Sequence, residues 1–244
     1  MKVIAMIPAR LQASRFPKKL LSDLCGQTVI TRTYQATVNT GLFDAVYVVT
    51  DSAEIKAEIE ANNGNVIMSL QEHECGSDRI AEAADMVPGD IIINVQGDEP
   101  FTRKEPLEDL IEVFKKDIHG EIAVASLVHT MDDWEEIENP NNVKVVLDNK
   151  KCVMYFSRAP IPHPRDKSVD TTYYKHIGIY AFRRYALLNF PKMKMCQNEA
   201  TEKLEGIRFL EHGMKMKMVE TPFKVIGIDV PEDLEKAKQM IQHG

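Results

Sequence analysis

Over its first 130 residues the chain alternates short apolar runs with stretches of helical periodicity. The β-branched runs Val3–Ile7, Ala45–Thr50 and Asn65–Met68 are too short for helices and are typical of buried strands. Between them, residues 28–39 and 53–62 repeat apolar side chains at near-helical spacing. Strands that alternate with helices pair in parallel through right-handed crossovers, so the pattern predicts an α/β fold with a mostly parallel sheet.

The same alternation continues to about residue 128 and then changes. It predicts a helix over 80–86, a very apolar strand over 91–95, a helix over 106–116 and a strand over 122–128. Beyond Asp132 the pattern predicts a β-rich region and a final helix. Its expected elements are a hairpin of 143–147 with 152–157, a strand within 173–182, a helix over 202–212, strands over 215–220 and 225–228, and a helix from Pro231.

Length and composition limit the class of protein. A chain of 244 residues fits one large α/β domain, or one domain with a small lobe. The net charge of −7 and the pI near 5.6 argue against a nucleic-acid binder that relies on general positive charge. The four cysteines are too widely spaced for a zinc site or a disulfide framework, which favours reduced thiols in the cytoplasm. No apolar run is long enough for a signal peptide or a membrane span.

A basic loop and two aspartates form the most specific candidate site. The loop after the first strand carries Arg10, Arg15 and Lys19, and no acidic residue occurs before Asp23. Asp98 and Asp229 each follow a predicted apolar strand, so both are expected at the carboxyl edge of the sheet. Carboxylates that face cations there suit Mg²⁺ and a polyphosphate. A helix cap at Asp229 and a simple turn at Asp98 are the structural alternatives.

Further polar residues are weaker candidates. Gly76 and Gly97 allow the backbone to approach a ligand, although isolated glycines also serve ordinary turns. Arg79 suits a base or a phosphate, or else a neighbouring acid. Arg158 and His176 are candidates for holding an acidic substrate, because a guanidinium fork matches a carboxylate, whereas a lone histidine is often structural.

In their order along the chain, these motifs resemble the 3-deoxy-manno-octulosonate (Kdo) cytidylyltransferase family. The resemblance covers nearly the whole length. It is carried by Ile7-Pro8-Ala9-Arg10, Ser14-Arg15-Phe16-Pro17-Lys18-Lys19, His73 to Arg79, Asn94-Val95-Gln96-Gly97-Asp98-Glu99-Pro100, Asn141 to Val146, Tyr155-Phe156-Ser157-Arg158, His176 to Tyr180, Glu202-Lys203-Leu204-Glu205 and Gly227 to Leu234.

The resemblance implies a Rossmann-like nucleotidyltransferase core with helices on both faces of the sheet. It implies one domain over 1–244, with a core of about 1–130 and 215–244 and a smaller β-rich lobe of about 131–214 for sugar binding and dimerisation. The implied reaction converts CTP and Kdo to CMP-Kdo and pyrophosphate for lipopolysaccharide synthesis, with Mg²⁺ as cofactor. The expected partners are these small molecules and a second copy of the chain in a homodimer, without nucleic acid or membrane.

The family motifs also imply roles for individual residues. Arg10, Arg15 and Lys19 would hold the triphosphate. Ala9, Gly76, Ser77 and Arg79 would shape the cytidine pocket. Asp98 and Asp229 would hold Mg²⁺, with Asp98 also counted in the nucleotide site. Lys19, Arg15, Asp98 and Asp229 are thus the expected catalytic residues, and Gln96, Arg158, His176, Tyr180 and Glu205 would line the sugar site.

Three departures from the family pattern affect these expectations. Lys18 stands where the first loop usually has glycine, Cys75 stands where a hydroxyl is usual, and Gly206 replaces a glutamine. The change at Gly206 leaves open another acid sugar, such as 8-amino-Kdo or a sialic acid. A non-catalytic nucleotide-binding regulator is the alternative of a different class, whereas a glycosyltransferase would lack its usual Asp-x-Asp motif here.

Overall fold

The structure is a computed structural model, and it describes residues 1–244 except 13–15, 72, 74, 167, 224–225 and 244. The chain forms two compact units. Unit 1 contains Met1–Leu107 and Val225–Gly244, and unit 2 contains Glu108–Lys224. The two units are described separately below.

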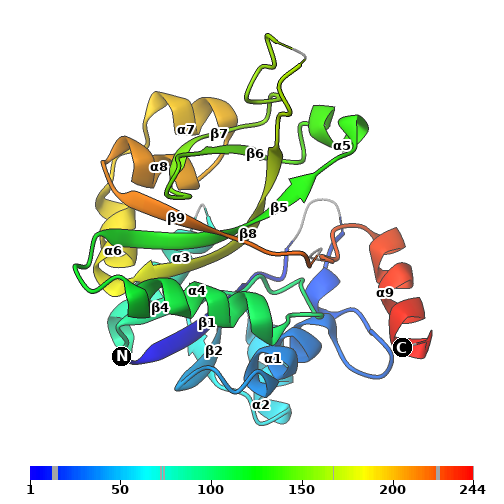
Figure 1. The fold of residues 1–244 in the computed structure, drawn as a ribbon. Helices are drawn as coiled ribbons and strands as arrows, with labels where there is room; N and C mark the ends of the chain where they lie inside the picture. Colours follow the sequence, from blue (N-terminus) through cyan, green and yellow to red (C-terminus); the bar gives the residue numbers. More distant parts are fainter. Residues whose placement is uncertain (13–15, 72, 74, 167, 224–225, 244) are drawn as a thin grey trace. The chain divides into compact units, whose positions relative to one another are not determined.

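Unit 1 is built on a parallel sheet. Its strands are β1 (Val3–Ala9), β2 (Ala45–Thr50), β3 (Val66–Met68) and β4 (Ile91–Asn94), in the spatial order β3-β2-β1-β4 (Figure 1). The chain moves outward from β1 to β3 and then returns to place β4 on the other side of β1. This reversal leaves a crevice-forming switch point beyond the carboxyl ends of β1 and β4, which is where open α/β sheets bind ligands.

The helices of unit 1 follow from the same topology. They are η1 (Lys19–Leu21), α1 (Val29–Asn39), α2 (Ala53–Ala61), α3 (Gly76–Met86) and α9 (Pro231–His243). Right-handed crossovers put α1 and α2 on one face of the sheet and α3 on the other. The hydroxyls of Thr28 and Ser52 cap α1 and α2 by accepting from backbone N–H groups, as expected for residues at helix starts. The predicted α/β class is thus confirmed.

The first strand is longer than its apolar run predicts. The apolar run Val3–Ile7 ends before Pro8, yet β1 continues through Pro8 to Ala9. β4 pairs with β1 only as far as Met6, while Pro8 lies opposite Val49 of β2. A proline without an N–H group is tolerated there because one side of the strand has no ladder partner.

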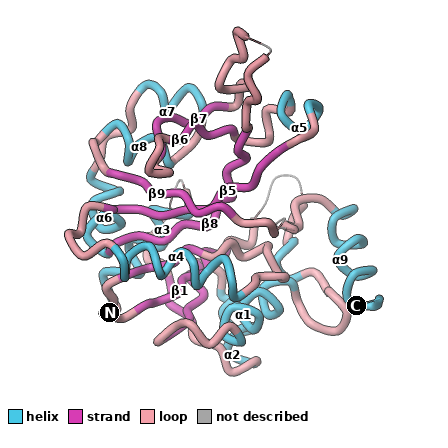
Figure 2. Tube along the Cα trace, viewed as in Figure 1, coloured by secondary structure: helices cyan, strands magenta, loops and turns pink. Residues whose placement is uncertain are grey.

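Unit 2 is organised around a mixed sheet. β5 (Ile122–Met131) pairs with β8 (Tyr173–Arg183) in antiparallel and with β9 (Lys215–Glu220) in parallel. The predicted hairpin is present as β6 (Lys144–Leu147) and β7 (Val153–Ser157), and β6 also pairs with β8. The helices, coloured cyan in Figure 2, include α5 (Trp134–Glu138), α6 (Arg184–Asn189), η2 (Phe190–Lys192), α7 (Gln197–Glu202) and α8 (Gly206–Glu211). Helix α4 (Lys104–Lys116) runs across the boundary between the units in sequence.

The helix predicted over 202–212 is wrong at its beginning. Helix α7 ends at Glu202 because Lys203 takes a left-handed conformation, with φ of 56°, and α8 begins only at Gly206. A bidentate ion pair holds the two short helices together: Arg208 Nε and Nη2 donate to Glu199 at 2.7 and 2.6 Å. Both side chains are buried, and the guanidinium also stacks on Phe190.

The strand predicted over 225–228 is also wrong for the described residues 226–228, and residue 225 lies outside the described part. This apolar segment joins no sheet. Ile228 instead donates a single backbone hydrogen bond of 2.9 Å to the carbonyl of Asp98. Hydrophobicity predicted burial of Ile228 correctly, since it is fully buried, but burial does not require a strand.

Unit 2, Glu108–Lys224, is larger than the expected lobe of about 131–214. β5 and β9 belong with unit 2 because both form its sheet together with β8. A single nucleotidyltransferase domain over 1–244 stays a prediction.

Candidate active site

Lys19 lies at the centre of the charged site in unit 1. Its Nζ donates to Asp98 Oδ2 in a short hydrogen bond and to Asp229 Oδ1 at 3.0 Å. These three residues are called the Lys19 cluster below. The two carboxylates lie 131 positions apart in sequence and converge on one ammonium group, as the predicted site at the sheet edge requires.

Local structure explains how the two aspartates meet. Asp98 lies in a turn after β4, and the Ile228–Asp98 backbone bond fastens the segment before α9 to that turn. Asp233, in the first turn of α9, accepts from the backbone N–H groups of Asp229 and Val230, which leaves the Asp229 carboxylate to face Lys19. Asp233 thus satisfies backbone donors just before α9, as an acidic residue in the first turn of a helix can.

The two carboxylates of the Lys19 cluster stabilise the charged form of Lys19. Burial alone would lower the pKa of Lys19, but attraction and hydrogen bonds from Asp98 and Asp229 outweigh it and hold this pKa above its ordinary value. Lys19 therefore stays a cation, with a side chain only 14% exposed.

The cluster has the donor set that Mg²⁺ uses. Mg²⁺ is commonly bound through one or two protein carboxylates together with waters and substrate phosphates. Two carboxylates that already converge on one cation meet this requirement. The described residues contain no group of three or more His, Cys, Asp and Glu side chains placed to hold a metal by themselves.

The turn that presents Asp98 needs its glycine. A Cβ on Gly97 would lie 3.0 Å from the carbonyl oxygen of Pro8 and 3.2 Å from Ile30. Its own carbonyl accepts from Thr33 Oγ1 at 3.0 Å. Gly97 thus permits a close approach of the turn to β1 and α1. Beside it, burial and the neighbouring Asp98 raise the pKa of Glu99 to about 8, so this carboxyl is mostly protonated at neutral pH.

The predicted cytidine residues lie at the beginning of α3 and the end of β1. Helix α3 begins at Gly76, four residues earlier than its apolar periodicity predicts, so Gly76 and Ser77 occupy its first turn. Arg79 is buried and donates to Asp51 at 2.8 Å, which lowers the pKa of that carboxyl. Its Nη1 is buried and has no hydrogen-bond partner in the part of the chain that the structure describes. Ala9 is buried at the end of β1.

The structure explains why the first loop usually carries glycine at position 18. Lys18 has a left-handed backbone with φ of 56°, immediately before η1. Its side chain is exposed and forms an ion pair with Glu54 at 2.9 Å. Arg10, also in this loop, is exposed. Arg15, which was expected to hold the triphosphate, lies outside the described residues.

In unit 2, Arg158 is held by Glu202. The Glu202 carboxylate accepts from Ser157 Oγ at 2.7 Å and from the backbone N–H of Arg158 at 2.9 Å. Arg158 Nε donates to the Glu202 carbonyl at 2.7 Å, and Nη1 donates to the Pro140 carbonyl at 2.9 Å. These contacts orient the guanidinium without neutralising it by direct pairing. In the sequence, Glu202 stands out only as part of the motif Glu202-Lys203-Leu204-Glu205. Its distance from Arg158 along the chain does not predict that it orients this side chain.

The predicted sugar residues on β8 form a neutral aromatic group. His176 packs edge-on against Phe156, with ring centroids 5.0 Å apart, and lies 5.2 Å from Tyr180. Its Nε2 is 3.0 Å from Ser126 Oγ. These four residues are called the His176 cluster. Burial lowers the pKa of His176 to about 4 and raises that of Tyr180, so both rings are uncharged at neutral pH.

Gly206 fits tightly against the same cluster. A Cβ there would lie 3.1 Å from Phe156 and 3.2 Å from the Tyr180 hydroxyl. The neighbouring Glu205 occupies the N-cap position of α8 without a capping hydrogen bond from its side chain, and its charge contributes to the raised pKa of Tyr180. A glutamine at this position would therefore require Phe156 or Tyr180 to move.

The structure divides the predicted residues between the two units. The predicted nucleotide and metal residues belong to unit 1, as does Gln96, which follows β4. Arg158, His176, Tyr180 and Glu205 belong to unit 2.

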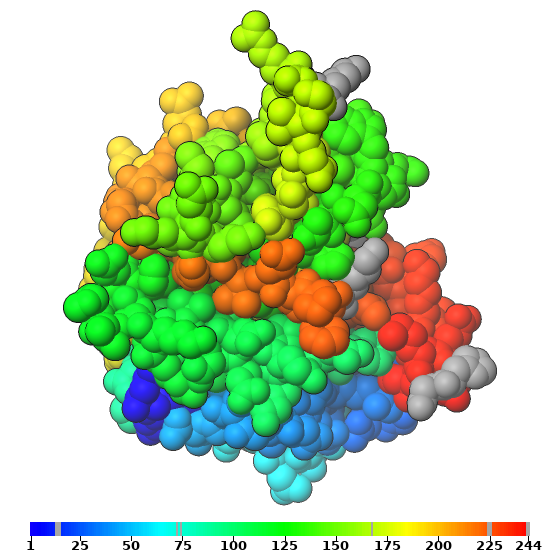
Figure 3. All heavy atoms as spheres, viewed as in Figure 1, coloured from blue at the N-terminus to red at the C-terminus, as the bar shows by residue number. Residues whose placement is uncertain are grey.

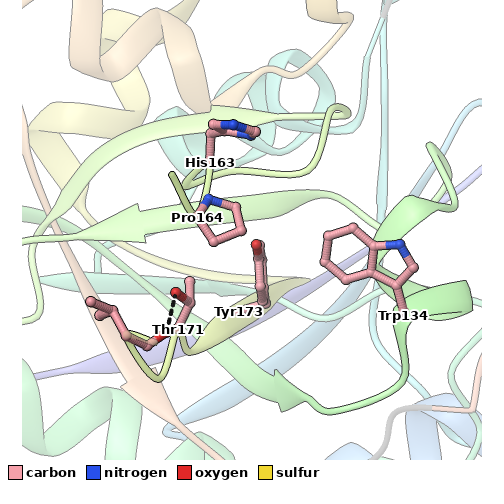
Figure 4. Close-up of a pocket in the computed structure, with 6 residues that line it drawn as sticks. Trp134, His163, Pro164, Thr171 and Tyr173 are labelled. Atoms are coloured by element: carbon pink, nitrogen blue, oxygen red, sulfur yellow. Dashed lines mark hydrogen bonds between the residues drawn. The ribbon is translucent and has the colours of Figure 1, made fainter. Parts of the chain in front are cut away.

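Unit 2 also contains a cavity of about 400 Å³ apart from these residues. It is lined by Trp134, His163, Pro164, Val169, Thr171 and Tyr173 (Figure 4). The loop between β7 and β8 supplies four of them and, drawn in yellow-green, stands out in the space-filling view (Figure 3). The buried Tyr173 hydroxyl has no hydrogen-bond partner among the described residues.

The sequence is similar to those of known cytidylyltransferases. A family model described as cytidylyltransferase matches residues 4–217. The chain is 57% identical to a 3-deoxy-manno-octulosonate cytidylyltransferase of Christiangramia forsetii, covering 98% of this chain and 97% of the relative. It is 55% identical to the enzyme of the same description from Flavobacterium johnsoniae, covering 99% of each chain.

The chain belongs to the 3-deoxy-manno-octulosonate cytidylyltransferase family. Within this family of nucleotidyltransferases, its fold is similar to that of a CMP:2-keto-3-deoxy-manno-octonic acid synthetase solved with CTP. The two share a TM-score of 0.93 and 35% identity, and the match covers 99% of each chain. The Rossmann-like nucleotidyltransferase fold expected from the sequence is therefore confirmed. None of the helices in the described part of the chain is both long enough and apolar enough to cross a bilayer.

Proposed function

We propose that this cytidylyltransferase-family chain transfers CMP from CTP to Kdo and releases pyrophosphate. The observation that carries the proposal is the Lys19 cluster, in which Asp98 and Asp229 converge on one cation beyond the carboxyl end of β4. The similarity to a synthetase solved with CTP supports the same nucleotide. In the proposed reaction, the anomeric hydroxyl of the sugar attacks the α-phosphorus, and the bond to the leaving pyrophosphate breaks.

Unit 1 supplies the residues that we assign to the nucleotide. We assign Lys19 and Arg10 to the triphosphate, whose negative charge their cations would reduce, and we propose the same role for Arg15. Arg79 offers its unpartnered Nη1 in a buried position next to the first turn of α3, which supports a role in the cytidine pocket together with Ala9, Gly76 and Ser77.

We assign Mg²⁺ to Asp98 and Asp229. When bound, the ion supplies positive charge that polarises the phosphoryl oxygens. The remaining contribution of the protein is to orient the substrates and to exclude water, because such transfers depend on positioning and electrostatic stabilisation more than on covalent steps.

Unit 2 supplies the residues that we assign to the sugar acid. Arg158 is oriented by carbonyl groups, and Nη2 has no acceptor among the described residues, so the guanidinium can bind the sugar carboxylate. The neutral His176 and Tyr180 can exchange hydrogen bonds with sugar hydroxyls. Glu205, and Gln96 of unit 1, complete the proposed set of sugar-binding residues.

A pyrophosphate-release assay tests the proposed function. With Mg²⁺, release is expected only when CTP and Kdo are both present; release of CDP, or none at all, would contradict it. Parallel reactions with UTP and ATP test the nucleotide. Parallel reactions with 8-amino-Kdo and a sialic acid test the sugar, because Gly206 removes the usual glutamine from the site. Preferential turnover of either would change the substrate and not the reaction.

We also propose that the chain forms a homodimer through the β6–β7 hairpin. Met154 on β7 is 63% exposed, so its apolar side chain is available to a partner surface. Met154→Asp should therefore shift the solution mass, measured by light scattering, towards that of a monomer. Met240→Asp on α9, at a position 45% exposed, is the matched control and should not. A wild-type monomer would rule out the dimer. Cytoplasmic location stays a prediction.

A further inference from the structure

Ser126 occupies an irregular position in the sheet of unit 2. It is a fully buried residue of β5, opposite Tyr180 of β8. The next pair is Leu127 with Ile177, so the register shifts between these positions and Gly178 and Ile179 form a bulge. Bulges redirect side chains and backbone groups and are common next to functional sites.

The bulge brings three polar atoms to the Ser126 hydroxyl. Ser126 Oγ lies 3.0 Å from the Ile177 carbonyl, 2.8 Å from the Ile179 carbonyl and 3.0 Å from His176 Nε2. A hydroxyl has one proton to donate, and carbonyl oxygens only accept. If Ser126 donated to the imidazole, its oxygen lone pairs would face both carbonyls. The arrangement is satisfied when Ser126 donates to a carbonyl and accepts from a protonated Nε2.

We propose that Ser126 is a positioning residue that fixes His176 as the Nε2–H tautomer and leaves Nδ1 as a hydrogen-bond acceptor for the substrate. The hydrogen bond at one ring nitrogen decides which nitrogen carries the proton. Phe156 and Tyr180 contact the imidazole ring and restrict its orientation, whereas Ser126 determines which ring nitrogen carries the proton.

The role in substrate binding rests on the proposed function. His176 is a half-buried residue, so it is not closed off completely from a ligand. An acceptor nitrogen there selects a hydroxyl donor, as a sugar provides, and not a second acceptor. Sequence alone does not reveal Ser126, because its distance of 50 positions from His176 gives no periodic signal.

The first test is the tautomer itself, measured by nitrogen-15 NMR of the ring nitrogens in the full-length protein without substrate near pH 7. We expect Nε2 of His176 to be protonated and Nδ1 to be bare. His129 is an internal reference of the opposite kind, because its Nδ1 lies 3.1 Å from the Thr221 carbonyl and must donate to it. A protonated Nδ1 at His176 in the wild type would overturn the proposal, whatever the activity of the enzyme.

The second test compares kinetic constants. Ser126→Ala should give a mixture of tautomers and raise KM for Kdo about tenfold, with KM for CTP within about twofold of wild type. Ser126→Thr keeps the hydroxyl and should restore both the tautomer and KM. Thr37→Val removes another fully buried hydroxyl that donates to a carbonyl, and should change neither.

These measurements separate the two proposals. If Ser126→Ala leaves the tautomer and KM unchanged, Ser126 has no positioning role. If Ser126→Ala does not fold, the wild-type tautomer and Ser126→Thr still decide. If no acid sugar is turned over but Nε2 is protonated, the proposed function fails and the assignment of the tautomer stands.

Discussion

The Lys19 cluster and the His176 cluster are both polar, but the first keeps its charges and the second is uncharged. Around Lys19, full charges are kept and balanced, since one ammonium group faces two carboxylates. Around His176, burial removes charge, and recognition depends on directed hydrogen bonds and aromatic contacts. The first arrangement suits a polyphosphate and a metal ion, whereas the second discriminates shape and hydroxyl pattern. Changes to each cluster should therefore have different consequences.

The largest expected effect comes from removing one charge of the Lys19 cluster. Asp98→Asn should lower kcat/KM for pyrophosphate release by about 100-fold or more, because a carboxylate proposed to hold Mg²⁺ and pair with Lys19 becomes neutral. Asp109→Asn, at an exposed position on α4, is the matched control and should stay within about twofold. A loss at Asp98 no greater than that of the control would remove this residue from the proposed mechanism.

The His176 cluster should show its effect in stability at low pH. The folded-state pKa of about 4 is below the ordinary value of 6.5, so the unfolded state binds the additional proton in this range. The stability due to neutral His176 is present above pH 6.5 and is lost as the pH falls towards 4. The loss is on the order of 3 kcal/mol.

Denaturant unfolding between pH 7 and pH 4 measures this loss. His176→Asn, which has no imidazole to protonate, should show a much weaker dependence on pH over the same range. An unchanged dependence would mean that other groups produce the acid sensitivity.

The His176 cluster is also packed tightly against Gly206. Gly206→Ala should lower the free energy of unfolding by about 1–3 kcal/mol, because the new Cβ would crowd Phe156 and the Tyr180 hydroxyl. Gly227→Ala is the matched control: no atom lies within 4 Å of its added Cβ, and its φ is not positive. Equal effects of the two variants in urea unfolding would show that Phe156 and Tyr180 move aside without cost.

The smallest expected effect concerns the loop next to Lys19. Lys18→Gly should raise the free energy of unfolding by about 1 kcal/mol, since glycine adopts the left-handed backbone without a steric penalty. Glu54→Gln removes the exposed ion pair alone and should change stability by less than about 0.5 kcal/mol. A destabilised Lys18→Gly variant would show that the lysine side chain matters more than the backbone.

Much of unit 1 could be predicted because periodicity and parallel topology agree there. The strand β2 and the helices α1 and α2 lie at or close to their predicted positions, and Asp98 follows β4 as predicted. Asp229 meets it although residues 226–228 before it form no strand. The failures have local causes. Lys203 adopts a left-handed conformation without the glycine that would signal it, and the buried segment before Asp229 pairs through one hydrogen bond instead of a ladder.

The polar contacts within unit 2 could not be predicted from patterns. Glu202 orients Arg158 through a carboxylate and a carbonyl, 44 positions away, and Ser126 contacts His176 through a bulge. Such contacts depend on three-dimensional register, which a one-residue shift would change completely. Periodicity identifies the faces of the strands but not these partners.

The bond between Lys19 and Asp229 joins positions 210 residues apart. Because unit 1 combines Met1–Leu107 with Val225–Gly244, all of unit 2 is synthesised before Asp229. The early strands can collapse long before then, since synthesis adds only about 5–20 residues per second. The charged centre is therefore assembled last, and a nascent chain that has already acquired most of its tertiary structure still lacks one of its two carboxylates.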